Sequence, residues 1–165
     1  MKLISPKKII INTLIVLIIF FLDRVSKIYI INLAELENSL EIYINSYLNL
    51  YLIWNKGIAF GLFSFDESFV YNFITILILV ILLIILILIF KSETHKSYVY
   101  TIILGGALGN LFDRFYYSAV PDFIDIHFKG FHWFIFNVAD IFITIGVVCL
   151  ILDELFFYKK NNEIK

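Results

Sequence analysis

Asp122 and Asp140 are the residues of this chain whose type and position best suit catalysis. Each stands where a hydrophobic stretch meets what the pattern predicts to be the same side of a membrane. An ionisable group at a bilayer margin is costly unless it is paired, so each is a candidate functional residue. Two carboxyls that meet can share one proton, because like charges a few ångströms apart do not both ionise easily. The pair therefore predicts the chemistry of an aspartic protease.

The two carboxyls have structural interpretations as well. In Asn137-Val-Ala-Asp140, Asn137 can cap a helix while Asp140, at the third helical position, reaches back to it. Capping and catalysis are compatible, since the dipole of a helix N-terminus favours an ionised carboxylate. We therefore expect Asp140 to be the ionised member of the pair. Either Asp122 or Asp125 could instead be a solvated acid in a loop.

Other hydrolase and metal chemistries can be tested by motif. His95, His127 and His132 do not have the spacing of the H-E-x-x-H zinc motif. The only cysteine, Cys149, lies inside a hydrophobic run, which indicates packing and leaves no Cys/His zinc-finger pattern. The serine-hydrolase motif G-x-S-x-G and the motif Gly-x-Gly-Asp are also absent. The sequence thus predicts no metal site and no cofactor, and the aspartate pair remains.

The composition indicates which elements must position these residues. The 165 residues are 61% hydrophobic and 18% aromatic, with a mean hydropathy of +0.92, which is typical of a membrane protein. The net charge of −1 and the absence of a basic run exclude nucleic acid as an expected partner. A membrane-spanning helix needs about 20 apolar residues. Four segments qualify, and they make residues 1–165 a single polytopic membrane domain: about 8–28, 69–90, 98–116 and 138–157.

Loop lengths and charges predict the orientation. The second and third segments are joined only by Lys91 to Ser97, so the two longer loops share the opposite side. The side with both termini carries most of the lysines: Lys2, Lys7, Lys8, Lys91, Lys96, Lys159, Lys160 and Lys165. The positive-inside rule therefore places both termini in the cytoplasm and the two aspartates near the extracytoplasmic face.

The N-terminal segment resembles a secretory signal, because three lysines precede the apolar run Ile9 to Leu22. The run ends in Asp23-Arg24 without a small-residue cleavage site, which favours a retained first helix. The long outer loop, about 32–68, is predicted to be rich in β structure, with a strand or small sheet in Leu40 to Trp54. Gly57 to Phe65 is apolar but too short to span, so it is expected in the interface as a short helix or loop.

Further polar residues gather near the outer margin, and each group has a structural alternative. Asp23 and Lys27 are four apart on one helix face, either as a local ion pair or as the wall of a polar site. Asn55 and Gly57 fit a simple turn or a site loop.

In the third segment, the small residues of Gly105-Gly-Ala-Leu-Gly109 favour close packing of helices. After them, Asn110 and Arg114 share a face, and an interfacial salt bridge of Asp113 or Asp23 with Arg114 is plausible.

Taken together, these residues resemble the lipoprotein signal peptidases, also called signal peptidase II, the bacterial prolipoprotein peptidases. The resemblance covers about residues 9–157. Five short patterns carry it by their order and spacing: Asp23 with Lys27, Asn55-Lys-Gly-Ile-Ala-Phe60, Gly109-Asn-Leu-Phe-Asp-Arg114, Pro121-Asp-Phe123 and Phe136-Asn-Val-Ala-Asp140.

The resemblance implies a membrane aspartic endopeptidase of the bacterial cytoplasmic (inner) membrane, with Asp122 and Asp140 as the catalytic pair. It implies substrate-binding or site-supporting roles for a further set: Asp23, Lys27, Asn55, Gly57, Asn110, Arg114, Asn137 and Ala139. The implied substrates are prolipoproteins with a lipobox, cleaved before a cysteine that carries diacylglycerol, with membrane lipid and globomycin-type inhibitors as further partners. The implied fold is all-α, with four transmembrane helices, a small extracytoplasmic β-cradle and a short interfacial helix.

Two departures from the family pattern stand out. Pro121 occupies a position where valine is common, and its fixed φ should stiffen the approach to Asp122. Arg24 occupies a position where glutamine is common. Neither change removes a catalytic group.

The main alternative is a small ion-coupled membrane transporter, in which acids relay ions or protons. The polar residues argue against it, because they gather at one membrane face instead of along a path. A non-catalytic assembly factor that uses Gly105 and Gly109 for docking leaves both aspartates unexplained.

Overall fold

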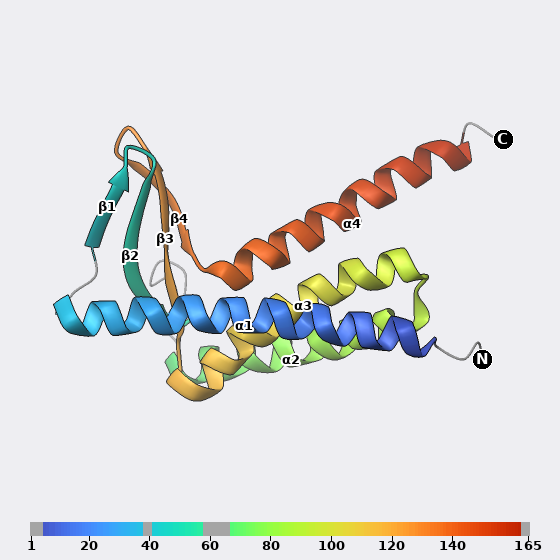
Figure 1. Cartoon of the computed structure of the whole chain (residues 1–165), viewed down its shortest axis with the longest axis horizontal. Helices are drawn as coiled ribbons and strands as arrows, with labels where there is room; N and C mark the ends of the chain where they lie inside the picture. The colour runs from blue at the N-terminus through green and yellow to red at the C-terminus, as the bar shows by residue number, and fades with distance from the viewer. Residues whose placement is uncertain (1–4, 38–40, 58–66, 163–165) are drawn as a thin grey trace.

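The computed structural model of the chain describes residues 5–37, 41–57 and 67–162, which form four helices and four strands (Figure 1). The helices are α1 (Pro6–Glu37), α2 (Glu67–Lys91), α3 (Thr94–Tyr117) and α4 (Val138–Asn162). The strands are β1 (Glu41–Asn45), β2 (Leu48–Asn55), β3 (Val120–Phe128) and β4 (Phe131–Phe136). Each of the four predicted helical segments lies within an observed helix.

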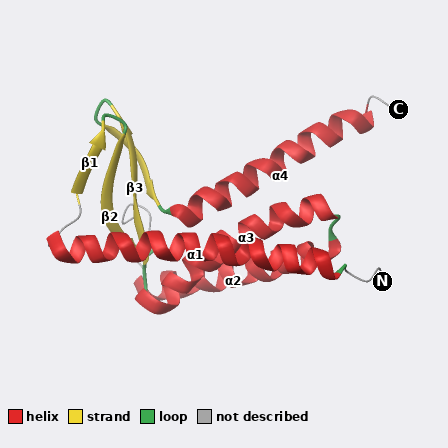
Figure 2. Ribbon diagram, viewed as in Figure 1, coloured by secondary structure: helices red, strands yellow, loops and turns green. Residues whose placement is uncertain are grey.

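The helices run side by side, and the sheet stands at one end of them (Figure 2). Helix α3 packs against α1, α2 and α4, so it is the central helix of the bundle. Helix α4 starts beside the sheet and leaves the other helices toward its C-terminal end (Figure 1). The first turns of α1 and the last turns of α4 lie at the end away from the sheet (Figure 1).

Glycines of α3 allow its close contacts. A Cβ at Gly106 would lie 2.5 Å from the carbonyl oxygen of Ala139 in α4. A Cβ at Gly105 would lie 3.0 Å from the side chain of Ile19 in α1, and one at Gly109 would meet the Asp23 carboxylate at 2.5 Å. The prediction that the small residues of this segment serve helix packing is therefore confirmed.

The sheet is antiparallel in the order β1-β2-β3-β4. Strands β1 and β2 confirm the β structure that was predicted in Leu40 to Trp54. Strands β3 and β4 were not predicted, so the protein has more β structure than the all-α description implies. Lys129 and Gly130, with φ of 50° and 80°, form the two-residue turn between them, which is a geometry favoured in β-hairpins.

The exterior is apolar along the helices. Two helical stretches, Pro6–Leu36 and Phe69–Lys91, are long and apolar enough to cross a membrane within the described residues. In the most apolar window of the second, only 17% is buried, so its side chains face outward as expected for contact with lipid. This supports a membrane protein, while spans by α3 and α4 remain predictions. The short interfacial helix predicted in Gly57 to Phe65 lies almost entirely outside the described residues.

Gly106→Ala should destabilise the bundle by about 1–3 kcal/mol. The added methyl meets a backbone carbonyl, which cannot move without displacing α4. Gly105→Ala is the matched control, because its methyl meets only the Ile19 side chain. Thermal unfolding of the two variants in detergent should give the lower Tm for Gly106→Ala, and the reverse order would contradict this account of the α3–α4 contact.

Candidate active site

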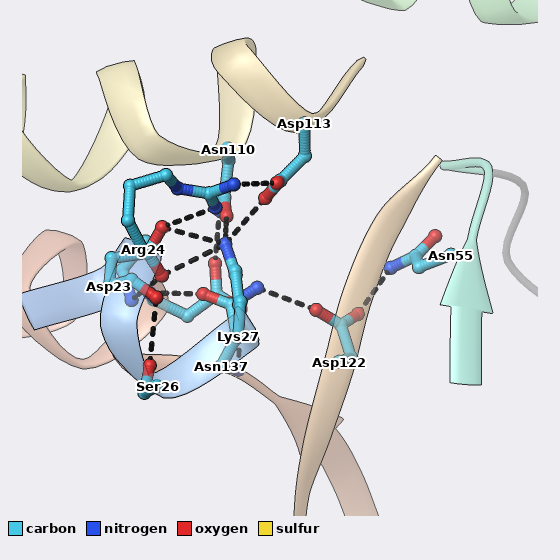
Figure 3. A network of polar contacts seen from close by, with 11 residues as sticks. Asp23, Arg24, Ser26, Lys27, Asn55, Asn110, Asp113, Asp122 and Asn137 are labelled. Carbon is cyan, nitrogen blue, oxygen red and sulfur yellow. Dashed lines mark hydrogen bonds and ion pairs between the residues drawn. The ribbon is translucent and has the colours of Figure 1, made fainter. Parts of the chain in front are cut away.

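A buried ammonium group lies at the centre of the polar residues. Lys27 of α1 is fully removed from solvent. Its Nζ donates to Asp23 Oδ2 at 2.9 Å, to Asn110 Oδ1 at 2.8 Å and to Asp113 Oδ2 at 2.6 Å (Figure 3). An ammonium has three N–H donors, so each of them has a partner. The predicted pairing of Asp23 with Lys27 is present, and it extends from α1 to α3.

Arg24 completes this cluster. Its guanidinium lies 2.8 Å from Asp23 and 2.5 Å from Asp113, and it stacks over the Phe112 ring at 4.9 Å from the ring centre. Two cations thus face two carboxylates, which makes the cluster neutral. The salt bridge that was expected between Arg114 and Asp113 or Asp23 is not formed, because Arg24 and Lys27 hold both acids.

Arg114 instead faces α2 and the loop after β2. Its guanidinium lies 5.2 Å from the centre of the Tyr71 ring, and the Tyr71 hydroxyl donates to the Arg114 carbonyl. A Cβ at Gly57 would lie 2.6 Å from Arg114 Nη2, and Gly57 has a φ of 85°. Glycine is thus favoured here by both space and backbone conformation. The backbone N–H of Gly57 donates to Asn55 Oδ1 at 2.6 Å, as in the predicted turn.

Asp140 is held at the first turn of α4. The backbone N–H of Asn137 donates to Asp140 Oδ2 at 3.1 Å, and the backbone N–H of Asp140 donates to Asn137 Oδ1 at 3.2 Å. This reciprocal pair is a capping box, which confirms the predicted structural role of both residues. Asn110 of α3 donates from Nδ2 to Asp140 Oδ1 at 2.8 Å. Both oxygens of the carboxylate therefore accept a hydrogen bond.

Asp122 lies in β3 and is 4% exposed. Asn137 donates from Nδ2 to Asp122 Oδ1 at 2.6 Å, and Asn55 of β2 donates from Nδ2 to Asp122 Oδ2 at 2.9 Å (Figure 3). Asn137 thus contacts both acids, one from β3 and one from α4. Asp122 is not a solvated loop acid.

The environment of Asp122 makes its carboxyl harder to ionise than a free one. Burial raises the pKa of Asp122 from 3.8 to about 6, and the nearby charge of Asp140 acts in the same direction. The amides of Asn55 and Asn137 and the charge of Lys27 act in the opposite direction but do not cancel the effect of burial. A carboxyl with such a pKa can gain and lose a proton near neutral pH, which suits general acid–base chemistry.

The structure brings together the residues that the sequence singled out. The backbone N–H of Ala139 donates to Asp23 Oδ1 at 3.0 Å, which ties α4 to the charged cluster on α1. Direct contacts then connect the remaining members in one series: Lys27, Asn110, Asp140, Asn137, Asp122, Asn55, Gly57 and Arg114.

The sequence interpretation missed some of the polar partners. Arg24 was noted only as a departure from a family pattern, and the role of Asp113 was left open, yet both belong to the buried cluster. A second group, Asp125, His127 and His132, lies together on the sheet. Residues two apart in a strand point to the same face of the sheet. The spacing of Asp125 and His127 could therefore have indicated that their side chains lie together.

Comparison with known proteins gives a consistent result. A family model described as signal peptidase (SPase) II matches residues 15–156. A lipoprotein signal peptidase of Pelagibacter ubique (strain HTCC1062) is 58% identical over 164 residues, which cover 99% of each chain. A lipoprotein signal peptidase of Anaplasma phagocytophilum (strain HZ) is 38% identical over 158 residues, which cover 96% of this chain and 98% of the relative.

Two solved structures, each described as a bacterial membrane enzyme, have the same fold. One aligns with a TM-score of 0.70 and 27% identity over 87% of each chain. The other aligns with a TM-score of 0.69 and 30% identity over 87% of this chain and 92% of its own.

Lys27→Met should destabilise the protein by about 3–5 kcal/mol, because it leaves two buried carboxylates with only one cation. Lys96→Met is the matched control. The Lys96 ammonium pairs with Asp153 at 3.3 Å in a much more exposed place, so its loss should lower the stability far less. Thermal unfolding in detergent measures the stability of both variants. Equal Tm values would show that the buried Lys27 cluster stabilises the protein no more than the more exposed Lys96–Asp153 pair does.

The Tm of the parent protein should fall as the pH rises from about 4 to about 6. In this range the folded chain binds a proton at Asp122 that the unfolded chain has released, so a rising pH favours unfolding. Asp122→Asn cannot titrate and should lack this contribution. The measurement is the difference in Tm between variant and parent at each pH, and a difference that does not change between pH 4 and 6 would refute the raised pKa.

Proposed function

The chain belongs to the signal peptidase II family, and we propose that Asp122 and Asp140 are the catalytic pair with which this peptidase cleaves its substrates. The observation that carries this proposal is the position of Asn137, which hydrogen-bonds the side chains of both acids. Its side-chain amide holds the carboxyl of Asp122 and its backbone N–H holds that of Asp140, so one residue brings together two acids from different elements, as an aspartic endopeptidase requires. Family membership also favours a peptidase over the ion-coupled transporter.

The two acids have different environments, which suits a division of roles. Asp140 accepts a backbone N–H and a side-chain amide at a helix N-terminus, and both contacts favour a carboxylate. Asp122 is 4% exposed, and its pKa of about 6 lets it hold a proton closer to neutral pH than a free carboxyl does. We therefore assign the first general base to Asp140 and the first general acid to Asp122.

In the proposed reaction, Asp140 removes a proton from a water molecule as the water oxygen attacks the scissile carbonyl carbon. Asp122 donates its proton to the carbonyl oxygen, which gives a neutral tetrahedral intermediate. Asp140 then donates the proton it gained to the leaving nitrogen, while Asp122 takes a proton back from a hydroxyl of the intermediate. The C–N bond breaks, and the pair returns to its starting state.

The proposed substrates are prolipoproteins that carry a lipobox, cleaved just before a cysteine modified with diacylglycerol. The apolar exterior of α1 and α2 supports entry of such a lipidated chain from the membrane lipid. Globomycin-type peptides are expected to inhibit cleavage. Gly57 and Arg114 lie next to Asn55, which binds Asp122, so they are proposed to contact the substrate backbone.

We further propose that the four helices cross the bacterial cytoplasmic membrane as one polytopic domain of residues 1–165. Both termini would be cytoplasmic, and the sheet with the active site would lie at the extracytoplasmic face. The arrangement supports this topology, because the sheet and the ends of α1 and α4 with the two termini lie at opposite ends of the helices (Figure 1). Lys8 and Lys91 belong to the end away from the sheet, as the positive-inside rule requires for the cytoplasmic side.

The decisive experiment measures cleavage of a lipidated, lipobox-containing precursor by the purified protein in detergent. Asp122→Asn and Asp140→Asn should each lower the rate by at least about 1,000-fold, because neither amide can exchange a proton. Asp153→Asn is the matched control on α4, since Asp153 pairs with Lys96 far along the helix from Asp140. Its rate should equal that of the parent.

Near-parental cleavage by either Asp122→Asn or Asp140→Asn would refute the catalytic pair. If the parent cleaved neither the lipidated precursor nor any related one, the assignment of substrate would be wrong. The Tm of each variant shows whether a lost rate reflects chemistry or unfolding.

A further inference from the structure

A second cluster of polar side chains lies on the sheet, apart from Asp122 and Asp140. Asp125 and His127 are two residues apart in β3, so they share a face, and His132 of β4 pairs directly across from His127. Each of the three offers a ligand atom, and these atoms all lie within 4.8 Å of one another. The two imidazole rings stack, with centres 5.1 Å apart.

The contacts inside this cluster leave buried polar atoms unsatisfied. Nδ1 of His132 lies 2.8 Å from Asp125 Oδ2, while Nδ1 of His127 lies 3.7 Å from the same oxygen. Asp125 is 3% exposed, yet its Oδ1 has no hydrogen-bond partner, and neither has the buried Nδ1 of His127. Buried polar atoms without a protein partner are uncommon, and two of them at one place are available to bind a ligand.

The cluster adjoins a hollow on the same side of the sheet. A cavity of about 340 Å³ is lined by Glu41, Asn49, Tyr51, Asp125, His132 and Ile135. Asn49 pairs directly across from Asp125 on β2, and its Oδ1 is also buried without a partner. The hollow therefore has room for an ion and a water molecule, and it supplies further oxygen atoms.

We propose that Asp125, His127 and His132 form a binding site for a divalent transition-metal ion, with Zn²⁺ as the ion that their chemistry suits best. Two imidazoles and one carboxylate are a common donor set for Zn²⁺, with bonds of about 2.0–2.2 Å. In a tetrahedral site such bonds set ligand atoms about 3.3 Å apart, between the 2.8 Å and 3.7 Å found here. A water molecule in the adjoining hollow completes the fourth position.

The ion joins β3 to β4, because its ligands come from both strands of the hairpin. It does not take part in the chemistry of the carboxylate pair, since Asp122 is bound through Asn55 and Asn137 and not through these residues. The expectation of no metal site was based on the residue spacing of known zinc motifs, such as H-E-x-x-H on a helix. Ligands on the two strands of a hairpin have a different spacing in the sequence.

The test loads the purified full-length protein with ZnCl₂ by equilibrium dialysis and measures bound zinc per chain. The parent should bind about one ion, whereas His127→Ala and His132→Ala should each bind at least about 100-fold more weakly. His95→Ala is the matched control, because His95 is an exposed histidine on α3. It should bind zinc as the parent does.

Two further readouts separate loss of a ligand from loss of the fold. Zinc should raise the Tm of the parent and of His95→Ala but not that of His132→Ala, each compared with the same protein without zinc, so that any loss of stability from the missing Asp125–His132 hydrogen bond cancels. Co²⁺ in place of zinc should give the visible absorption of a four-coordinate site only in the parent and the control.

Equal zinc binding by the parent and both histidine variants would overturn the proposal by placing the ion elsewhere. Absence of binding by the parent would also overturn it and leave a hydrogen-bonded Asp125–His132 pair. Neither outcome depends on peptidase activity, so failure of the metal site and failure of the proposed function are distinguishable.

Discussion

The Lys27 ammonium, removed from water at the junction of three helices, is the group on which the rest of the structure depends. Burying a charge costs several kcal/mol unless its hydrogen bonds and counter-charges are restored. Asp23, Asp113 and Asn110 restore them, and this fixes α1 against α3. The other oxygen of Asp23 accepts the N–H of Ala139, so the start of α4 is set by the same cluster.

The position of the carboxylate pair follows from that junction. Asn110 contacts Lys27 through its oxygen and Asp140 through its nitrogen. The ammonium therefore fixes which way the Asn110 amide is turned, and the amide nitrogen in turn holds the Asp140 carboxylate in place. The close approach of the α3 and α4 backbones at Gly106, and the space that Gly109 leaves for the Asp23 carboxylate, are required for these short side chains to reach. The same contacts therefore determine both the packing of the helices and the geometry of the site.

Much of this arrangement could be predicted from the sequence, where local patterns determine it. Apolar runs indicated all four helices, and the spacing of Asn137 and Asp140 indicated the capping box that begins α4. Strands β3 and β4 were missed because the acids and histidines between Asp122 and His132 interrupt the apolar alternation by which strands are recognised. Which neighbouring helix a long side chain faces is not a local property. For this reason the sequence alone could not show that Arg24, and not Arg114, pairs with Asp113.

The amide links around the two carboxyls also limit where protons can travel. Within the described residues, every hydrogen bond to the side chains of Asp122 and Asp140 comes from an asparagine amide or a backbone N–H. Such groups donate hydrogen bonds but do not release their protons, so Asn110 transmits the electrostatic potential of Lys27 without conducting its protons. These amides therefore separate the two carboxyls from the other groups that could exchange protons with them. The proton shared by the two acids is therefore exchanged only with water or substrate, and each turnover leaves the buried cluster in the charge state in which it began.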